Sequence, residues 1–278
     1  MRRLRNDPAT FRDTTISSLP TFRGKPLTVG RIVRSVRGRL FDGGAPLNSC
    51  RGVYADFAEA KRSAPPSKPL GYDAANSADW YLSKLDSLAL EDYPIVYWLR
   101  SAFEDSRTVF EIGGHIGEAY YGFARIVPYP AGHEWTICDV PSIAEAGAKL
   151  ARERGNTNLR FVTDPSQTAG ADILLACGAL QYFEPSTLAP VLAPYRVRPR
   201  HILVNVTPVY DGPSFVTLQN IGSAYCPYRI FGRAEFVGAL ENLGYTLVDA
   251  WRKDRALSIP GHPEKSLEHY SGFYFRAR

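Results

Sequence analysis

The sequence predicts an α/β fold, with a Rossmann-like, mostly parallel sheet of seven strands that carries helices on both faces. From residue 108 onward, short apolar runs alternate with helical patterns, which is typical of a parallel sheet. A glycine-rich turn joins the first apolar run to the first of these helices. No helix is expected between the last two runs, because residues 253–271 are polar and rich in Gly and Pro. These two strands should pair antiparallel, whereas a dinucleotide-binding sheet would end parallel.

The predicted strands are runs of apolar residues bounded by turn formers. They lie at 108–112, 135–139, 159–163, 172–176, 201–206, 245–252 and 272–276. Helices are predicted after Gly117 to about residue 127, and at 142–155, 186–195 and 233–243. Ser142 and Glu145 have the spacing of a capping box, and Gly155 follows the same helix where a C-terminus favours glycine.

Two further parts are predicted upstream of a core at 106–278. Residues 49–105 contain three helical patterns, so we expect a helical cap there, with helices at 54–62, 78–88 and 93–103. Residues 1–48 are predicted to be a basic, partly mobile N-terminal arm. The first 40 residues hold ten Lys and Arg against two Asp and Glu, whereas the remaining 238 hold 23 against 26.

The arm contains one amphipathic pattern, at residues 28–41, with arginines mostly off the apolar stripe. Such a helix can contact a membrane surface or an anionic partner. The pattern slightly favours the alternative, a helix packed on its own domain with solvated arginines. Because the body is mildly acidic, a nucleic-acid partner is not expected.

Composition excludes several classes of protein. With 45% hydrophobic and 22% charged residues, the chain is neither disordered nor fibrous. Its longest uncharged apolar stretch, residues 173–183, is too short for a membrane-spanning helix. The four cysteines lie far apart without metal-ligand spacing, so we expect no metal and a reducing, cytoplasmic location.

The glycine-rich turn at 111–117, EIGGHIG, is the main chemical signal. Small residues let a ligand approach backbone N–H groups there. The dinucleotide pattern G-x-G-x-x-G fails, since His115 and Glu118 occupy its third and sixth positions. The turn instead fits E/D-x-G-x-G-x-G with its middle glycine replaced, and Glu111 suits a ligand with an ammonium group. The ligand-binding candidates in this turn are Glu111, Gly113, Gly114, His115 and Gly117.

Three other predicted strand ends carry groups that suit an adenosine-type ligand. Asp139 stands where a carboxylate accepts hydrogen bonds from ribose hydroxyls, and Asp164 where it can reach an adenine amino group. Cys177 and Gly178 end the fourth strand, beside the point where the strand order reverses. Each signal alone is weak, but together with the glycine turn they predict an adenosine-type ligand.

These segments resemble class I S-adenosylmethionine-dependent methyltransferases, at 109–117, 135–141 and 171–183. Residues 50–278 resemble more closely a family that is inferred to consist of methyltransferases and is found beside bacterial surface-polysaccharide genes. The shared segments are Gly52-Val53-Tyr54, Gly71-Tyr72-Asp73, Tyr93-Pro94 with Trp98, Gly178-Ala179-Leu180-Gln181-Tyr182, Tyr225-Cys226-Pro227-Tyr228-Arg229 and Ser271-Gly272-Phe273-Tyr274-Phe275.

The resemblance implies S-adenosylmethionine as cofactor, S-adenosylhomocysteine as product, and no metal. It places Glu111 and the glycine turn at the methionine part. Asp139 would hold the ribose with Val140 beside the adenine, and Asp164 would lie near the adenine edge. Cys177 and Gly178 would lie near the sulfonium.

The catalytic group is less clear from the sequence. Plant-type O-methyltransferases have a catalytic His where this chain has Gln181, which cannot act as a general base. Another group could take the proton, or proximity alone could supply the rate. The remaining catalytic candidates are His115, Tyr210 and Asp211. Residues 207–230 are predicted to be a long functional loop, and the substrate-binding candidates are Tyr120, Tyr121, Tyr182, Gln219, Asn220, Tyr228 and Arg229.

The sequence thus predicts methyl transfer to an oxygen or nitrogen of a small polar acceptor, with a sugar or a nucleotide-linked sugar as first choice. A non-catalytic S-adenosylmethionine-binding protein is the main alternative. An NAD(P)-dependent oxidoreductase is disfavoured by the failed glycine pattern, and a nucleic-acid methyltransferase by the acidic body. A homodimer is left open.

Overall fold

The computed structural model describes residues 21–22, 25–26, 41, 48–73, 82, 85, 87–184 and 188–278. The chain forms two compact units, Met1–Pro46 and Leu47–Arg278. In the first unit, β1 (Thr21–Phe22) pairs antiparallel with β2 (Lys25–Pro26). The predicted amphipathic helix at 28–41 lies outside the described residues except for Phe41, which is helical. The predicted helix at 78–88 also lies largely outside them.

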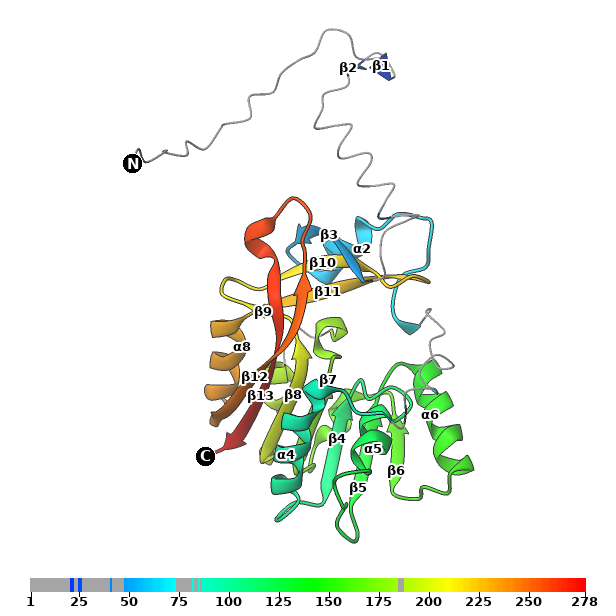
Figure 1. Ribbon diagram of the computed structural model, residues 1–278, viewed down its shortest axis with the longest axis vertical. Coiled ribbons are helices and arrows are strands. Elements are labelled where there is room, and N and C mark those ends of the chain that lie inside the picture. Colours follow the sequence, from blue (N-terminus) through cyan, green and yellow to red (C-terminus); the bar gives the residue numbers. More distant parts are fainter. Residues whose placement is uncertain are drawn as a thin grey trace, which may run out of the picture. The chain divides into compact units, whose positions relative to one another are not determined.

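The second unit contains a seven-stranded sheet in the order β12-β13-β8-β7-β4-β5-β6, which Figure 1 shows. Its strands are β4 (Thr108–Ile112), β5 (Glu134–Cys138), β6 (Leu159–Val162), β7 (Ile173–Cys177), β8 (His201–Thr207), β12 (Tyr245–Leu257) and β13 (Leu267–Ala277). The five strands from β8 to β6 are parallel, and β13 lies antiparallel between β8 and β12. The predicted fold class, with its antiparallel terminal hairpin, is confirmed.

The order of the strands reverses between β4 and β7. The chain runs from β4 through β5 to β6 on one side, and then from β7 to β8 on the other. In open α/β sheets a crevice forms at such a reversal, outside the carboxyl ends of the two strands. The glycine turn after β4 and the Cys177-Gly178 turn after β7 therefore face one another across this crevice.

Helices cover both faces of this sheet. They are α4 (Tyr93–Ala102), α5 (Glu118–Phe123), α6 (Pro141–Glu153), α7 (Leu188–Leu192) and α8 (Arg233–Glu241). Alternate strand residues enter opposite cores: Ile173 and Leu175 pack with α4, α5 and α6, whereas Leu174 and Ala176 pack with α7 and α8. Single-turn 3₁₀ helices lie at Leu90–Asp92 (η2), Pro165–Thr168 (η3), Leu180–Tyr182 (η4) and Pro263–Lys265 (η5).

The predicted capping box of α6 is wrong. The helix begins at Pro141 with Val140 as N-cap and no side-chain capping bond, because proline is pre-organised for the first helical position. Ser142 instead donates its hydroxyl hydrogen to Asp73, at 2.7 Å. Gly155 follows the helix with a φ of +70°, as its C-terminal position predicts.

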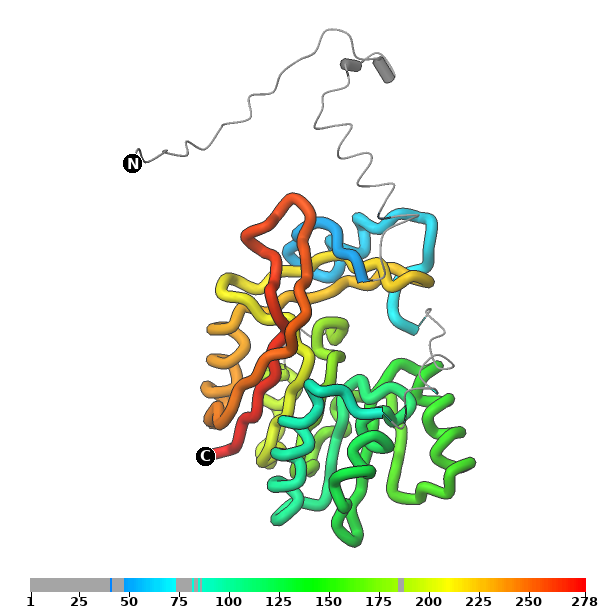
Figure 2. The backbone as a smooth tube through the Cα atoms, in the orientation of Figure 1, coloured from blue at the N-terminus to red at the C-terminus, as the bar shows by residue number. Residues whose placement is uncertain are grey.

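A second sheet, in the order β3-β10-β11-β9, corrects two predictions. Its strands are β3 (Ser49–Tyr54), β9 (Val209–Tyr210), β10 (Phe215–Asn220) and β11 (Tyr225–Gly232). The region 49–105 is therefore not wholly helical, and 207–230 is mostly strand rather than loop. Helix α2 (Phe57–Arg62) follows β3, and Figure 2 shows this blue segment beside the yellow β10–β11 hairpin. The three-part division of the chain stays a prediction.

The second sheet could not be predicted from the sequence, because its strands pair over long range. β3 pairs with β10 across more than 160 residues, as in the partnership of Leu218 with Arg51. Both faces of β10 are buried, so it lacks the alternation that marks a half-exposed strand. Pro227 in β11 also reads as a strand breaker, yet it lies opposite Leu218.

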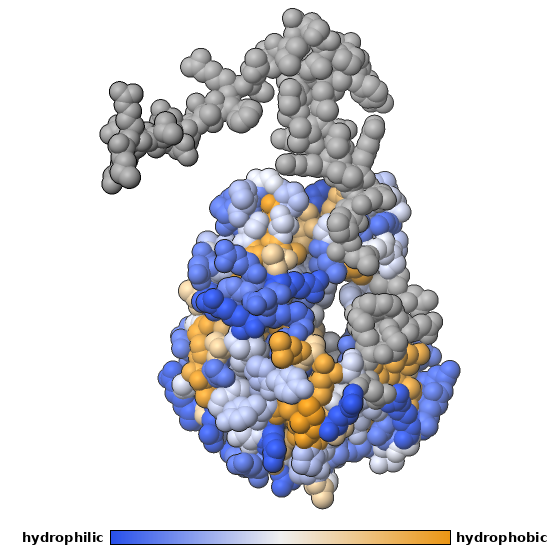
Figure 3. Space-filling model, viewed as in Figure 1, coloured by the Kyte–Doolittle hydropathy of each residue, from blue (hydrophilic) through white to orange (hydrophobic). Residues whose placement is uncertain are grey.

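The surface of the second unit is mixed in character. On the face drawn in Figure 3, hydrophilic residues surround smaller apolar patches. Within the described ranges there is no helix with the length and apolarity that a bilayer crossing requires.

Candidate active site

A cavity of about 940 Å³ opens at the carboxyl ends of β4, β5 and β7. On its other side lie Phe57 and Lys61 of α2, Tyr72, and residues 226–227 of β11. The second sheet and the loop that follows α2 thus border the crevice of the main sheet. Nine sequence-predicted residues line this cavity: Glu111, Gly113, Gly114, His115, Asp139, Val140, Cys177, Gly178 and Tyr182.

Two glycines in the turn after β4 are required for separate steric reasons. Gly113 has a φ of +67°, and a Cβ atom there would lie 2.2 Å from the Cβ of Ala179. A Cβ on Gly114 would lie 2.5 Å from the carboxyl carbon of Glu111. Such distances are far below van der Waals contact, so the first glycine lets the η4 segment approach and the second makes room for the Glu111 carboxyl group.

Glu111 is a buried carboxyl group on the cavity wall, with 1% of its surface exposed. Its Oε2 accepts a hydrogen bond of 2.9 Å from Nε1 of Trp135. Burial raises the pKa of Glu111 from its ordinary value of 4.5 to about 8, and the nearby Glu118 and Asp139 add to this rise. The group is therefore mostly protonated at pH 7, and a cation beside it would favour release of the proton.

Asp139, immediately after β5, connects two neighbouring strand ends. Its Oδ2 accepts a 2.8 Å hydrogen bond from the backbone N–H of His115, and its Oδ1 accepts one of 2.8 Å from that of Val140. Burial raises the pKa of Asp139 to about 6, although both hydrogen bonds act in the opposite direction. A carboxylate offers about four lone-pair sites, so two remain for a ligand.

His115 replaces the middle glycine of the expected pattern and keeps the backbone conformation of a glycine. Its φ is +53°, which few residues other than glycine adopt. The hydrogen bond to Asp139 holds this conformation. Its ring lies edge-on to Tyr72, with 6.5 Å between centroids, and burial lowers the pKa of the imidazole to about 4. The ring is therefore neutral at physiological pH.

The cavity also contains Glu91, Asp92 and Lys253, which the sequence analysis missed. Glu91 forms an ion pair with Lys253, and Asp92 accepts a 3.3 Å hydrogen bond from Nδ2 of Asn205. These residues come from η2, β8 and β12, so no local spacing connects them. The only signal in the sequence was the neighbouring Tyr93-Pro94 segment.

Aromatic side chains form another part of the wall. Tyr72 and Tyr182 lie 5.4 Å apart between ring centroids, and Phe57 and Phe183 line the cavity with them. The Tyr182 hydroxyl donates a 2.6 Å hydrogen bond to Oε1 of Gln219, which fixes the ring. Such faces favour contact with the apolar face of a ring-shaped ligand.

The lining holds more carboxyl groups than basic groups. Among the described residues it holds six carboxyl groups and two lysines: Glu91, Asp92, Glu111, Glu118, Asp139 and Glu184, with Lys61 and Lys253. Both lysines are in ion pairs, Lys61 with Glu184 at 3.1 Å and Lys253 with Glu91. The cavity therefore favours a ligand with positive charge over one with phosphate groups.

Several predicted site residues do not line the cavity. Asp164 caps η3 by accepting from the backbone N–H and the hydroxyl of Ser166, at 2.8 and 2.6 Å, although Thr163 and Pro165 beside it line the wall. Gln181 donates its amide hydrogen to the carbonyl of Gly178 at 2.6 Å. Gly117, with a φ of +106°, precedes α5 and packs near the Tyr121 ring. The Asp164 carboxylate and the Gln181 amide NH2 group thus have local partners outside the cavity.

The predicted tyrosines of the first helix belong to the core instead. Tyr120 donates its hydroxyl hydrogen to Oδ1 of Asn158 at 3.1 Å, and Tyr121 donates to Asn156 at 3.2 Å. Both rings are buried. Both rings pack in the core with residues of the main sheet, so neither reaches the cavity.

The site residues predicted in 207–230 lie in or beside the second sheet. Asp211 pairs with Arg233 at 3.2 Å, Tyr210 donates to the Pro213 carbonyl, and Tyr228 donates to the Tyr270 hydroxyl at 3.0 Å. Asn220 accepts from Lys68 at 3.0 Å, and Arg229 lies 5.0 Å from the Phe57 ring centroid. Of this group, Gln219 supports the cavity indirectly, through Tyr182.

No metal site is recognisable in the part of the chain that the structure describes: no three His, Cys, Asp or Glu side chains gather there suitably for an ion. All four cysteines are free thiols.

Comparison with solved structures returns methyltransferases. The N-terminal domain of EvdMO1 with bound SAH is 15% identical, with a TM-score of 0.45, over 69% of this chain and 83% of that one. Magnesium protoporphyrin IX methyltransferase from Synechocystis PCC 6803, with bound SAH, is 11% identical with a TM-score of 0.47, over 74% and 100%. An S-adenosylmethionine-dependent methyltransferase from Clostridium acetobutylicum ATCC 824 is 8% identical with a TM-score of 0.47, over 73% and 99%.

Because each identity is 15% or lower and each TM-score is below 0.5, these likenesses assign neither a ligand nor an activity to this chain. No protein-family model matches the sequence, and no curated protein matches it significantly.

Proposed function

We propose that this chain is an S-adenosylmethionine-dependent methyltransferase that acts on an oxygen or nitrogen of a small polar acceptor. The observation that carries the proposal is the acidic cavity at the strand reversal, with the carboxyl groups of Glu111 and Asp139 on its wall. S-adenosylmethionine has a sulfonium and an ammonium group against one carboxylate, so its charge complements this wall. When bound, it would supply an electrophilic methyl group.

The residues present fit such a ligand. Glu111 would accept a hydrogen bond from its ammonium group, and the glycine turn leaves the backbone accessible beside it. Asp139 has lone pairs left for two ribose hydroxyls, and Val140 adds an apolar contact for the adenine. Cys177 and Gly178 line the next strand end, which makes them candidates for the sulfonium side.

The same charges argue against a nicotinamide dinucleotide, which brings at least two phosphate charges. A helix N-terminus with free N–H groups usually neutralises such phosphates. Here the helix after the turn is only six residues long and begins with Glu118. The antiparallel β13 is a second difference from a sheet that binds dinucleotides.

We extend the charge argument to the acceptor. Of the two acceptors predicted from the sequence, an uncharged sugar suits the acidic lining better than a nucleotide-linked sugar. The aromatic wall of Tyr72, Tyr182 and Phe57 offers ring faces on which a sugar can stack. Transfer in the reducing cytoplasm agrees with four free thiols.

A ligand panel on the full chain tests the cofactor class. S-adenosylhomocysteine at 1 mM should raise the unfolding temperature, whereas NAD⁺, NADP⁺ and ATP at the same concentration should not. A shift with NAD⁺ alone would replace the proposal by the oxidoreductase alternative.

A non-catalytic S-adenosylmethionine-binding protein is the second candidate. The observation that favours it is the Gln181 amide, which is hydrogen-bonded to the Gly178 carbonyl at the position where plant-type O-methyltransferases have a catalytic His. Labelled methyl transfer to a panel of sugars and amines separates the two. Incorporation supports the enzyme, and ligand binding without incorporation into any acceptor supports the alternative.

A further inference from the structure

Asp92 is a cavity residue whose position is fixed by backbone and side-chain contacts. It ends η2, one residue before α4, and its side chain is half-buried. Its Oδ2 accepts a 3.0 Å hydrogen bond from the backbone N–H of Ala89, and its Oδ1 accepts one of 3.3 Å from Nδ2 of Asn205. The carboxylate is therefore oriented before any ligand arrives.

Asn205 is itself held rigidly at the carboxyl end of β8. It is 1% exposed, and its Oδ1 accepts a 3.0 Å hydrogen bond from Nε1 of Trp251 in β12. Its Nδ2 also donates to the carbonyl of Glu91 at 3.0 Å. Two strands of the main sheet thus determine where Asp92 lies.

The same asparagine ties Asp92 to the end of β7. The backbone N–H of Gly178 donates a 2.9 Å hydrogen bond to the Asn205 carbonyl. The next residue, Val206, lines the cavity with a φ of +51°, a strained value for a β-branched side chain. Strain of this kind clusters at functional sites.

The order of the strands gives the order of the groups along the cavity. Asp139 follows β5, the glycine turn follows β4, Gly178 follows β7, and Asn205 with Asp92 stands at β8. Adjacent strands are about 4.8 Å apart. With the ribose at Asp139 and the methionine part at the glycine turn, the sulfur lies between them, and its methyl group is free to point toward β7 and an acceptor beside β8.

Its electrostatic surroundings leave Asp92 able to accept a proton. Glu91 is neutralised by Lys253, whereas among the described residues no cation lies within ion-pair distance of Asp92. Burial raises the pKa of Asp92, and the hydrogen bonds from Ala89 and Asn205 together with the charge of Lys253 offset this rise only in part. A more basic carboxylate is a better proton acceptor near neutral pH.

We propose that the Asp92 carboxylate faces the transferred methyl group and is the general base of the reaction; this rests on the proposed function. The acceptor oxygen or nitrogen forms a bond to the methyl carbon, and the carbon–sulfur bond breaks with its electron pair left on sulfur. The acceptor's proton passes to Asp92. This assigns to Asp92 the role for which the sequence offered His115, Tyr210 and Asp211. Tyr210 and Asp211 are held outside the cavity by Pro213 and Arg233, and the His115 ring packs edge-on to Tyr72.

Sinefungin tests the placement without a known acceptor. This analogue carries an ammonium-bearing carbon where S-adenosylmethionine carries its methyl sulfonium, and S-adenosylhomocysteine has neither. Calorimetry on the full chain compares both ligands in the wild type and in Asp92→Asn. We expect at least tenfold weaker sinefungin binding in the variant, with S-adenosylhomocysteine changed less than about twofold.

Asp164→Asn is the matched control, because it makes the same chemical change at a carboxylate that caps η3 and does not line the cavity; the ratio of the two affinities should stay within about twofold of wild type. Equal effects of Asp92→Asn on both ligands, or no effect on sinefungin, would overturn the placement. If neither ligand binds the wild type, the proposed function fails first and the role of Asp92 fails with it.

Turnover tests the proton transfer separately. With an acceptor found in the methyl-transfer panel, Asp92→Asn should lower kcat by about 100-fold or more while KM changes little. If Asp92→Asn loses the preference for sinefungin but keeps its kcat, Asp92 lies beside the methyl group without acting as the general base. That result would overturn the assigned role in proton transfer.

Discussion

Asp139 and His115 are joined by a 2.8 Å hydrogen bond from the backbone N–H of His115 to the Asp139 carboxylate. The bond connects the end of β5 to the turn after β4, the two strand ends that we propose hold the ribose and the methionine part. The Asp139 side chain thus fixes the conformation of the turn and also lines the cavity.

We predict that Asp139→Ala weakens S-adenosylhomocysteine binding about tenfold or more, since two ribose hydrogen bonds and the His115 contact are lost. Asp164→Ala is the control. Both are carboxylates after neighbouring strands, but Asp164 only caps η3, so its loss should leave the affinity unchanged and lower stability only slightly. Calorimetry measures both, and equal affinities for wild type and Asp139→Ala would remove Asp139 from the site.

The raised pKa of the buried Glu111 carboxyl group should make the stability of the protein depend on pH. Its folded pKa is raised from 4.5 to about 8, so the native state holds its proton more tightly than the unfolded state. Its contribution is therefore fully present below pH 4.5 and is lost as the pH rises toward 8. Each unit of pKa difference corresponds to about 1.4 kcal/mol.

Glu111→Gln should remove this loss, because the amide oxygen can still accept from Trp135 while no charge can form. The free energy of unfolding, measured by denaturant titration from pH 5 to 8, should fall less steeply in the variant, by more than about 1 kcal/mol over the range. Parallel curves for the two proteins would show that Glu111 does not titrate as burial implies.

The glycine turn predicts a position-specific effect of alanine. Gly114→Ala would bring a methyl group to within 2.5 Å of the Glu111 carboxyl carbon, so stability should fall by about 1–3 kcal/mol, and S-adenosylhomocysteine affinity should fall with it. Gly238→Ala in α8 is the control. No atom lies within 4 Å of its Cβ, so it should stabilise the helix by up to about 1 kcal/mol. Equal effects of the two variants would contradict the steric account.

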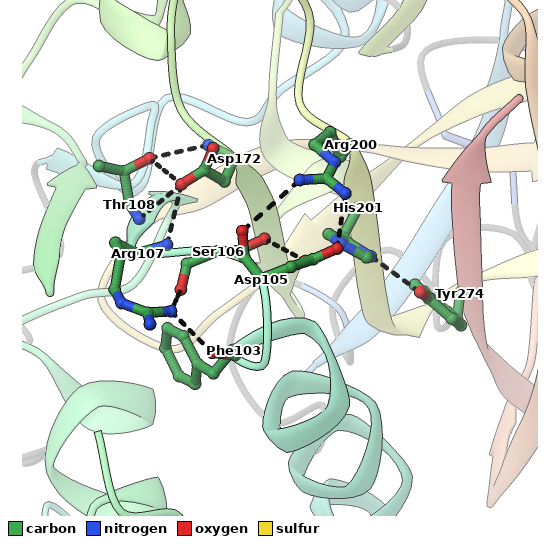
Figure 4. Close-up of polar contacts among 9 residues, drawn as sticks. All are labelled: Phe103, Asp105, Ser106, Arg107, Thr108, Asp172, Arg200, His201 and Tyr274. Carbon is green, nitrogen blue, oxygen red and sulfur yellow. Dashed lines mark hydrogen bonds and ion pairs between the residues drawn. The ribbon is translucent and has the colours of Figure 1, made fainter. Parts of the chain in front are cut away.

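A polar cluster lies at the amino-terminal edge of the sheet, opposite the cavity. Its loss should lower stability without changing ligand affinity. Figure 4 shows Asp172 beside Thr108, with Asp105, Arg200 and His201 nearby. Asp172 accepts from the backbone N–H groups of Arg107 and Thr108 at 2.9 and 3.0 Å, and from the Thr108 hydroxyl at 2.8 Å. These bonds join the starts of β4 and β7.

Asp172→Ala should therefore lower the free energy of unfolding by about 1–3 kcal/mol and leave ligand affinity unchanged. Burial alone would raise the pKa of Asp172, but the hydrogen bonds outweigh it and lower the pKa below its usual 3.8. The contribution should thus persist at neutral pH and disappear as the pH falls below about 4. Loss of S-adenosylhomocysteine binding in this variant would contradict the separation of the two edges.

The main sheet could be predicted because most of its strands are short local runs of apolar residues. Thr108 to Ile112, for example, are predicted and observed with identical bounds. The second sheet could not, because β3 and β10 meet only through the fold and neither alternates in burial clearly enough to mark a strand.

The candidate site shows the same difference between residues with local signals and residues positioned by long-range contacts. Glu111, the glycine turn and Asp139 are found from sequence because strand ends and glycine spacing are local. Asp164 is misplaced because a nearby Ser166 satisfies its carboxylate, and short-range capping outweighs a distant ligand. Asp92 is missed because Asn205, which orients it, is more than 100 residues away in the sequence.

Calorimetric titration of the full chain with S-adenosylhomocysteine at pH 7, in two buffers of different ionisation enthalpy, tests the central claim most directly. The account predicts saturable binding, with proton release as the ligand's ammonium group lowers the raised pKa of Glu111. The proton release should disappear in Glu111→Gln. No binding at millimolar ligand would contradict the claim of an S-adenosylmethionine site, and binding without proton release in the wild type would contradict the contact with Glu111.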